Sequence, residues 1–278
     1  MLRGRRTVGQ AGHLPPGGPY FCGPMAATAT LLPSLPQALR LAARLALQVG
    51  AALFLTSVAW VLAYRWVPPP ATFLMLERRA HAPEGRGYYG IRPEGERSIK
   101  YRFCTLSEVA PSVPLALVAA EDQRFLLHHG FDFEAISRAA RRNWNRAEGR
   151  PVVGGSTISQ QVAKNVFLWP GRSYLRKGAE AYFTLLIEVL WPKRRIMEMY
   201  LSVAEMGDCT FGVEAASRRY FGKPAAEVSP AEAALLAGVL PNPLRFRAEN
   251  PGPQARAKQR RVLRHMRALG GAAFLKAM

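Results

Sequence analysis

The sequence predicts a mainly α-helical domain that follows a single transmembrane helix. Residues 45–64 form an apolar run without a charge, and from residue 111 onward apolar residues recur at helical spacing. We find no internal repeat and no alternating apolar and polar series that would indicate a β-sheet. We therefore expect three parts: a disordered cytoplasmic N-terminus (1–44), a transmembrane anchor (45–66), and an exported domain (67–278) with a motif-bearing core (111–250).

The composition fits one packed domain with an anchor. Hydrophobic residues make up 49% of the 278 residues and charged residues 21%, which excludes wholesale disorder. Lys and Arg number 38 against 19 Asp and Glu, which gives a net charge of +19. This excess favours an anionic partner, and charge alone does not choose among nucleic acid, an anionic membrane and a phosphate-bearing substrate.

The cysteines show no metal-site spacing. Cys22, Cys104 and Cys209 form no CxxC pair. A disulfide between Cys104 and Cys209 stays open for an exported domain, but free, partly buried thiols are the expectation.

The run LALQVGAALFLTSVAWVLAY can cross a membrane, because a helix rises ~1.5 Å per residue and the hydrocarbon layer is ~30 Å thick. Aromatic residues that favour the interface lie at its far end: Trp60, Tyr64 and Trp66. Arginines and no acidic residues precede the run, which predicts a cytoplasmic N-terminus and a domain on the outer face of the inner membrane. Because the end of the run is a poor cleavage site, an uncleaved anchor is preferred over a signal peptide, and also over a buried core helix.

The segment before the anchor is expected to be disordered, because residues 1–24 are rich in Gly, Pro and Arg without periodicity. Met25 is a candidate start of the chain, since the residues from Met25 onward already form a complete anchor module.

The exported part is predicted to be a series of helices. Residues 71–110 mix charges, Gly and Pro, and predict loops, short strands or a helix. Ser229 and Glu232 form a capping box around Pro230, and the helix that they start should end before Pro241. The other predicted helices are 114–127, 157–168, 177–190, 192–205 and a basic amphipathic helix, 256–269.

The segment EDQRFLLHHG, residues 121–130, carries the first candidate site residue. Glu121 follows the apolar LALVAA, so desolvation should raise its pKa and suit it to general-base catalysis. His128 lies seven residues further on, on nearly the same face of the predicted helix. The alternative is a surface salt bridge of Glu121 or Asp122 with Arg124.

The segment GGSTISQQVAKN, residues 154–165, leads two glycines into a helix N-terminus, where free N–H groups attract anions. A buried stripe is expected at every fourth residue from Ile158. Thr157, Gln161 and Lys164 share another face with Gln160 beside them, which suits a sugar with a phosphate. A capped surface helix, with Thr157 and Gln160 as cap and box, is compatible with the same pattern.

Two further segments complete the pattern. In GRSYLRKGAE the cations Arg172, Arg176 and Lys177 can stabilise a pyrophosphate leaving group, although a solvated basic turn would look the same. In KRRIMEMYL, residues 193–201, Glu198 is expected to be structural. Inward-packing side chains are expected from this helix: Ile196, Met199, Tyr200 and Val203.

These segments, in this order, resemble the glycosyltransferase family that builds peptidoglycan from lipid II, also found as the first domain of bifunctional penicillin-binding proteins. EDQRFLLHHG matches the family motif Glu-Asp-x-x-Phe-x-x-His-x-Gly, and GGSTISQQVAKN, RKGAE, KRRIMEMYL and EAALLAGVLPNP match the others. Ser159 stands where Thr is usual and Ser202 where Asn is usual. The resemblance covers about residues 68–250, and without Ser-x-x-Lys or Lys-Thr-Gly it is nearest to the monofunctional members.

The resemblance implies a lysozyme-like, mainly helical fold with a small membrane-facing jaw. It implies polymerisation of lipid II into β-1,4 glycan strands with inversion at the anomeric carbon, polyprenyl pyrophosphate being the leaving group. The growing lipid-linked glycan chain and lipid II would be the substrates. Further implied partners are the anionic membrane surface and other cell-wall synthases, with no nucleic acid.

The resemblance also implies roles for single residues. Glu121 would be the catalytic base and Glu180 a second carboxylate in the cleft. Lys164, Arg176 and Lys177 would hold the pyrophosphate. Mg²⁺ or another divalent cation would bridge the pyrophosphate, without a metal site built from the protein alone. No organic cofactor is implied. The sugars and phosphate oxygens would be oriented by Ser156, Thr157, Gln160, Gln161 and Asn165.

Two other functions stay open. A lysozyme-like enzyme that cleaves glycan strands can share the fold and a catalytic Glu, but hydrolysis of a neutral bond needs no cationic pyrophosphate site. A non-enzymatic, basic, membrane-bound binding protein would account for the charge but leaves Glu121 without a role.

Overall fold

The computed structural model describes residues 37–80, 98–146, 154–171, 173–246 and 248–275. Of the N-terminal segment 1–44 that was predicted to be disordered, residues 37–44 belong to helix α1 (Gln37–Trp66) instead, and residues 1–36, with Cys22 and the candidate start Met25, lie outside the described residues. Arg172 also lies outside them. The chain divides into two compact units, Met1–Ala51 and Ala52–Met278, and the division falls inside helix α1.

Helix α1 contains the predicted anchor. Its segment Leu39–Trp66 is long and apolar enough to cross a membrane, by length and composition, and includes the predicted run 45–64. It is the one such helix among the described residues.

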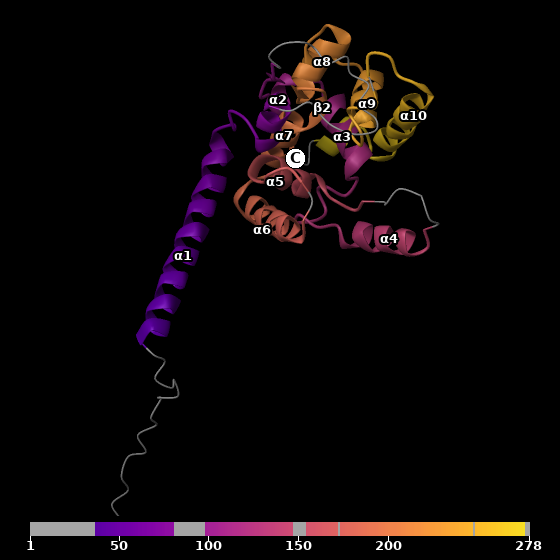
Figure 1. Cartoon of the computed structure of the whole chain (residues 1–278). Helices are drawn as coiled ribbons and strands as arrows, with labels where there is room; N and C mark the ends of the chain where they lie inside the picture. Colours follow the sequence, from indigo (N-terminus) through magenta and orange to yellow (C-terminus); the bar gives the residue numbers. More distant parts are fainter. Residues whose placement is uncertain (1–36, 81–97, 147–153, 172, 247, 276–278) are drawn as a thin grey trace, which may run out of the picture. The chain divides into compact units, whose positions relative to one another are not determined.

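The second unit is mainly α-helical, as predicted (Figure 1). A small sheet with strand order β1-β3-β2 pairs β1 parallel and β2 antiparallel to β3. The helices after α1 are α2 (Phe73–Ala80), α3 (Ser112–Glu121), α4 (Phe133–Trp144), α5 (Ile158–Phe167), α6 (Tyr174–Leu190), α7 (Lys193–Val203), α8 (Val213–Phe221), α9 (Pro230–Val239), α10 (Pro253–Ala268) and α11 (Ala272–Leu275). The strands are β1 (Lys100–Tyr101), β2 (Glu205–Gly207) and β3 (Thr210–Phe211), and short 3₁₀ turns lie at Leu106–Glu108 and Ala225–Glu227.

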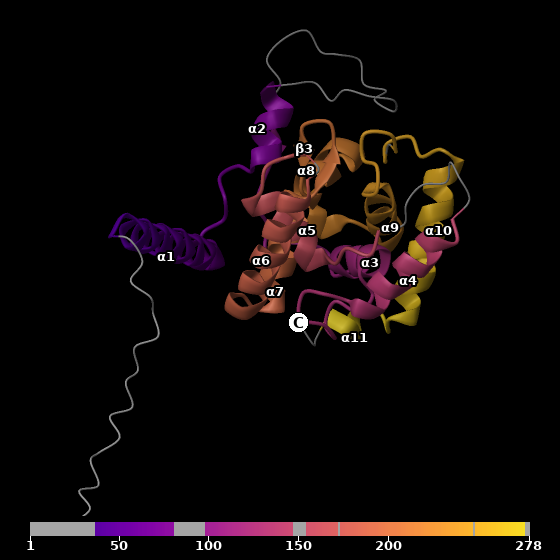
Figure 2. The ribbon, with the colours of Figure 1, turned by 60° about the horizontal axis from the view of Figure 1, so that its bottom comes forward.

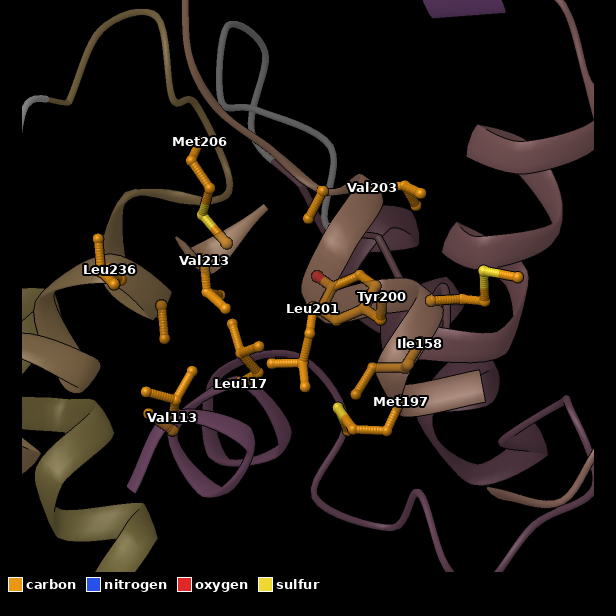
Figure 3. Packing of buried hydrophobic residues seen from close by; sticks show 14 of the residues in the cluster. Val113, Leu117, Ile158, Met197, Tyr200, Leu201, Val203, Met206, Val213 and Leu236 are labelled. Atoms are coloured by element: carbon orange, nitrogen blue, oxygen red, sulfur yellow. The ribbon is translucent and has the colours of Figure 1, made fainter. Parts of the chain in front are cut away.

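Helix α3 lies at the centre of this unit. It packs against α9 and α10, while α5 packs against α6 and α7 (Figure 2). The side chains from Val113 to Ala119 in α3 are all buried. Leu117 of α3, Ile158 of α5 and Leu201 of α7 meet in one apolar cluster (Figure 3). The core therefore holds the C-terminal end of α3, at Glu121, beside α5.

Local capping signals determine where helices α9 and α6 begin, and the sequence predicted the first of these boundaries correctly. The capping box of α9 is present, with the Ser229 side chain accepting from the Glu232 N–H. Helix α6 begins three residues earlier than predicted, because the Ser173 side chain accepts a hydrogen bond from the Arg176 N–H and caps it at Tyr174.

The predicted helix 114–127 is wrong in its second half. Helix α3 ends at Glu121, and turns follow it, with Phe125 N–H bonded to Asp122 O and Leu127 N–H to Arg124 O. His128 therefore does not share a helical face with Glu121.

The two described cysteines, Cys104 and Cys209, are buried thiols that form no disulfide among the described residues, as expected. Burial raises the pKa of the Cys104 thiol to about 11, so it stays protonated and unreactive at neutral pH. Ser202 is fully buried too, and its hydroxyl accepts from the Cys104 N–H (3.1 Å) and donates to Glu198 O (2.9 Å). The residue that replaces the usual Asn thus links backbone segments.

Candidate active site

Glu121 is the last residue of α3 and lies in a partly buried position beside α5. The Gln161 amide donates a 2.8 Å hydrogen bond to Glu121 Oε2. Burial raises the pKa of Glu121, and the Gln161 hydrogen bond together with the charges of Lys164 and Lys258 partly offsets this rise. The predicted desolvation of Glu121 is therefore confirmed, and a carboxylate with a raised pKa is a suitable general base.

Asp122, the neighbour of Glu121, has a structural role. Its buried carboxylate accepts the N–H of Ile158 at 3.0 Å and contacts His128 Nε2 at 3.0 Å with both oxygens. Asp122 therefore ties the motif loop to the start of α5. The alternative salt bridge to Arg124 is wrong, because Arg124 pairs with Asp132 and Glu134 instead.

The start of α5 is fixed by buried polar side chains. Thr157 and Gln160 form the capping box, and the Thr157 hydroxyl also donates to Gly130 O at 2.6 Å. Gly130 has φ +92°, and a Cβ there would lie 2.7 Å from Thr184 Cγ2, so only glycine fits. Two of the predicted substrate-binding residues, Thr157 and Gln160, are thus buried and hydrogen-bonded within the protein.

The remaining predicted polar residues of this segment are more accessible. Ser156 is exposed, and Gln161, Lys164 and Asn165 are partly buried on α5. Burial lowers the pKa of Lys164, the neighbouring charges of Glu180 and Glu121 raise it, and those of Arg176 and Lys177 lower it further. Helix α5 bears both Lys164 and Gln161, the hydrogen-bond partner of Glu121, and it packs against α6, so Glu121 and the cationic segment adjoin the same helix.

Glu180 organises the cations at the start of α6. Its buried carboxylate pairs with Arg176 at 3.4 Å and with Lys177. Arg176 Nε is buried and has no hydrogen-bond partner within the described residues. An N–H group of this kind is available for a ligand oxygen, because buried donors are rarely left unpaired. We call Lys164, Arg176, Lys177 and Glu180 the cationic cradle.

A cleft of about 610 Å³ opens beside Glu121. Ser156, Thr157 and Glu121 contribute to its wall, together with arginines of α4 and residues of α10 for which the sequence predicted no role in the site. A second, smaller pocket at Glu121 is also lined from α10. The additional polar residues are Arg138 and Arg142 of α4 and Lys258, Arg261 and His265 of α10.

No local signal marks these α10 residues, since their helix looks like a uniformly basic amphipathic segment. Only the packing of α10 on α3 and α9 turns one side of it toward Glu121. The sequence analysis predicted only a basic amphipathic helix here and missed this contribution.

The side chains at this site do not suit a resident metal ion. Among the described residues no group of three or more His, Cys, Asp or Glu side chains is placed to hold one. The single carboxylate of the cradle, Glu180, is already paired with two cations. These residues therefore do not form a metal site by themselves, and we derive no step through a metal.

The fold and the site together define a group-transfer enzyme. A desolvated carboxylate can accept a proton from a hydroxyl nucleophile, and the nearby cradle can stabilise an anionic leaving group.

Comparisons with known proteins identify the family. The transglycosylase family model matches residues 91–267. A biosynthetic peptidoglycan transglycosylase of Xylella fastidiosa (strain M23) is 48% identical over 221 residues, 80% of this chain and 87% of the relative. That of Xanthomonas campestris pv. campestris (strain B100) is 49% identical over 80% of this chain and 86% of its own length. That of Bdellovibrio bacteriovorus is 49% identical over 76% of this chain and 80% of its own length. The chain belongs to the transglycosylase family.

Proposed function

We propose that this chain is a peptidoglycan glycosyltransferase that polymerises lipid II into β-1,4 glycan strands. One observation carries the proposal: Glu121 lines a cleft and accepts a hydrogen bond from Gln161 of α5, and α5 also bears Lys164 and packs against α6, which bears the rest of the cationic cradle. The family membership and the names of the relatives support the same activity. Neither alternative function accounts for a base and a cradle at one site.

In the proposed reaction the growing chain is the donor and lipid II is the acceptor. Glu121 takes the proton of the acceptor's 4-hydroxyl as the oxygen attacks the anomeric carbon of the donor. The new β-1,4 bond forms as the α-linked bond to the pyrophosphate breaks, and the bonding electron pair leaves with the pyrophosphate. A single displacement inverts the anomeric carbon and needs no covalent enzyme intermediate.

The cradle supplies charge where the leaving group develops it. Lys164, Arg176 and Lys177 are proposed to bind the pyrophosphate oxygens, with the unpaired Arg176 Nε as one donor. Glu180 holds these cations in place. A divalent cation that bridges the pyrophosphate stays a prediction, in which the phosphate oxygens would supply most of its ligands.

The predicted sugar-binding residues divide into two groups by their positions. Ser156, Gln161 and Asn165 are accessible enough to contact a substrate directly. Thr157 and Gln160 are buried in the capping box, so we propose that they act by holding the start of α5. Loss of Ser156, Thr157, Gln160 or Asn165 should affect binding and positioning more than proton transfer, whereas Gln161 also hydrogen-bonds Glu121 and so acts on the proposed base as well.

The proposed location follows from the substrate. Lipid II is membrane-bound, and the apolar helix α1 is suited to hold the enzyme at the same membrane. We propose a single-pass topology with the N-terminus in the cytoplasm and the catalytic domain on the periplasmic face, based on the arginines before the span. Contacts with other cell-wall synthases and with anionic lipid headgroups are part of the same proposal.

The first experiment is polymerisation of labelled lipid II by detergent-solubilised full-length protein, with Glu121→Gln beside the wild type. We expect polymer from the wild type and a rate at least about 100-fold lower from the variant, which keeps the shape but cannot accept the proton. Equal rates would remove Glu121 from its role. Release of muropeptides from finished cell-wall sacculi, without polymer, would instead support the glycan-cleaving alternative.

A further inference from the structure

The hydroxyl of Tyr200 lies two hydrogen bonds away from Glu121. Tyr200 belongs to α7, is fully buried, and lies in the apolar cluster formed by α3, α5 and α7 (Figure 3). Its hydroxyl donates to Gln161 Oε1 at 3.2 Å, and Gln161 Nε2 donates to Glu121 Oε2 at 2.8 Å. The three side chains form a chain of hydrogen bonds that runs from the core to the base.

The direction of this chain is determined at Tyr200. Burial raises the pKa of Tyr200 well above its ordinary value, so the phenol remains protonated and must donate a hydrogen bond. In the described part of the chain the acceptor for that proton is Gln161 Oε1. A rotated Gln161 amide would place its oxygen against the Glu121 carboxylate and its NH₂ against the phenolic proton. The first contact would be repulsive, and the second would leave the phenolic proton without its acceptor.

We propose that Tyr200 is a positioning residue of the transferase reaction, which orients the Gln161 amide so that Glu121 is held as a carboxylate with one oxygen free for the substrate. The proposal rests on the proposed function, in which Glu121 is the base. It assigns to a buried residue of the KRRIMEMYL segment a role in the reaction that packing alone does not explain.

Other charges also act on Glu121 and have to stay constant in a test. Asp122 at the end of α3 raises its pKa, and Lys164 of α5 and Lys258 of α10 lower it. The pockets that Glu121 lines also expose further charged or titratable groups: Arg124, Asp132, Arg138, Arg142, Arg261 and His265. Because none of these residues is changed in Tyr200→Phe, a shift in the acidic limb of the pH profile of kcat/KM can be assigned to the hydrogen-bond chain.

The experiment is the pH profile of kcat/KM for lipid II polymerisation by the full-length protein. Tyr200→Phe lets the Gln161 amide rotate and weakens the hydrogen bond that favours ionised Glu121. We expect the acidic limb to move upward by roughly half a unit to one unit, with a three- to tenfold loss of rate below the limb and recovery above it. KM should change little, since Tyr200 does not reach the cleft.

The matched control is Tyr101→Phe, which removes a hydroxyl that donates to the Pro69 carbonyl at 2.9 Å. It should leave the limb in place. A second variant, Gln161→Met, removes the amide itself and must shift the limb at least as far. In the double variant, Tyr200→Phe should then add nothing further.

The outcomes separate the two proposals. An active wild type with an inactive Glu121→Gln variant but an unshifted limb in Tyr200→Phe would overturn the role of Tyr200 alone. Additive effects in the double variant would overturn it as well. A wild type that forms no polymer, or a Glu121→Gln variant as active as the wild type, would instead overturn the proposed function.

Discussion

Glu121, the proposed base, should also weaken the fold. The pKa of Glu121 is raised mainly by burial, so its ionised form is disfavoured in the folded protein. Its contribution to stability is therefore most favourable below the ordinary Glu pKa and is lost as the pH rises through the raised value. Glu121→Gln should melt a few degrees higher than the wild type at pH 8, and this gain should shrink as the pH falls.

Thermal unfolding at several pH values checks this sign, with Glu108→Gln as the control of opposite sign. The pKa of Glu108 is lowered by hydrogen bonds from the Thr105 backbone N–H and side chain. Its removal should lower the melting temperature at neutral pH, and the loss should fade in acid. A Glu121→Gln variant that is less stable than the wild type at pH 8 would contradict the assignment of Glu121 as a desolvated group.

Asp122 is adjacent to the base but should matter for stability first. Asp122→Ala leaves the Ile158 N–H and His128 without their buried acceptor, which should cost about 3 kcal/mol and lower the melting temperature by about 6–12 °C. Glu134→Ala is the matched control, because its ion pairs with Arg124 and Arg138 are solvent-exposed and screened and should contribute little to stability. Equal decreases in melting temperature for the two variants, measured by calorimetry, would show that the Asp122 contacts stabilise the fold no more than an exposed ion pair does.

At the scale of elements, the predictions that succeeded depend on local chemistry. The capping box of α9 is complete within Ser229 and Glu232, so the sequence was sufficient. The end of α3 at Glu121 was not predictable, because Asp122 bonds to Ile158, 36 residues away, and this contact exists only in the folded protein. The pairing of Glu121 with Gln161 and the orientation of Gln161 by Tyr200 were missed for the same reason.

Helix α10 forms a wall of the site as well as a basic surface. Arg261 lines both pockets at Glu121, whereas Arg264 is exposed on the same helix and lines neither. Arg261→Ala should raise the KM for lipid II roughly tenfold, which corresponds to about 1.4 kcal/mol, because a cation near an anionic substrate is lost. Arg264→Ala should leave KM unchanged. A similar KM for both variants in the polymerisation assay would show that Arg261 of α10 does not contribute to substrate binding.

At the scale of the whole molecule, the end of helix α1 belongs to the second unit, Ala52–Met278, which we call the catalytic unit. Trp191 Nε1 donates to Val61 O at 2.8 Å, and Arg195 donates to Tyr64 O at 2.9 and 3.1 Å. Trp60 packs edge-on against Phe167 at 5.2 Å. These contacts all lie within Ala52–Met278, so the segment that ends the candidate span is also part of the domain core.

Two truncations should therefore differ sharply in stability. Removal of residues 1–51 keeps every contact of the catalytic unit and should leave its melting temperature in detergent within about 2 °C of the full chain. Removal of residues 1–66 leaves the Trp191 and Arg195 donors unpaired and uncovers Phe167, which should cost at least about 3 kcal/mol. Calorimetry on both forms checks this expectation. Equal melting temperatures would mean that the helix end contributes nothing to the fold, whereas a large difference would place the start of the folded catalytic domain inside the anchor helix.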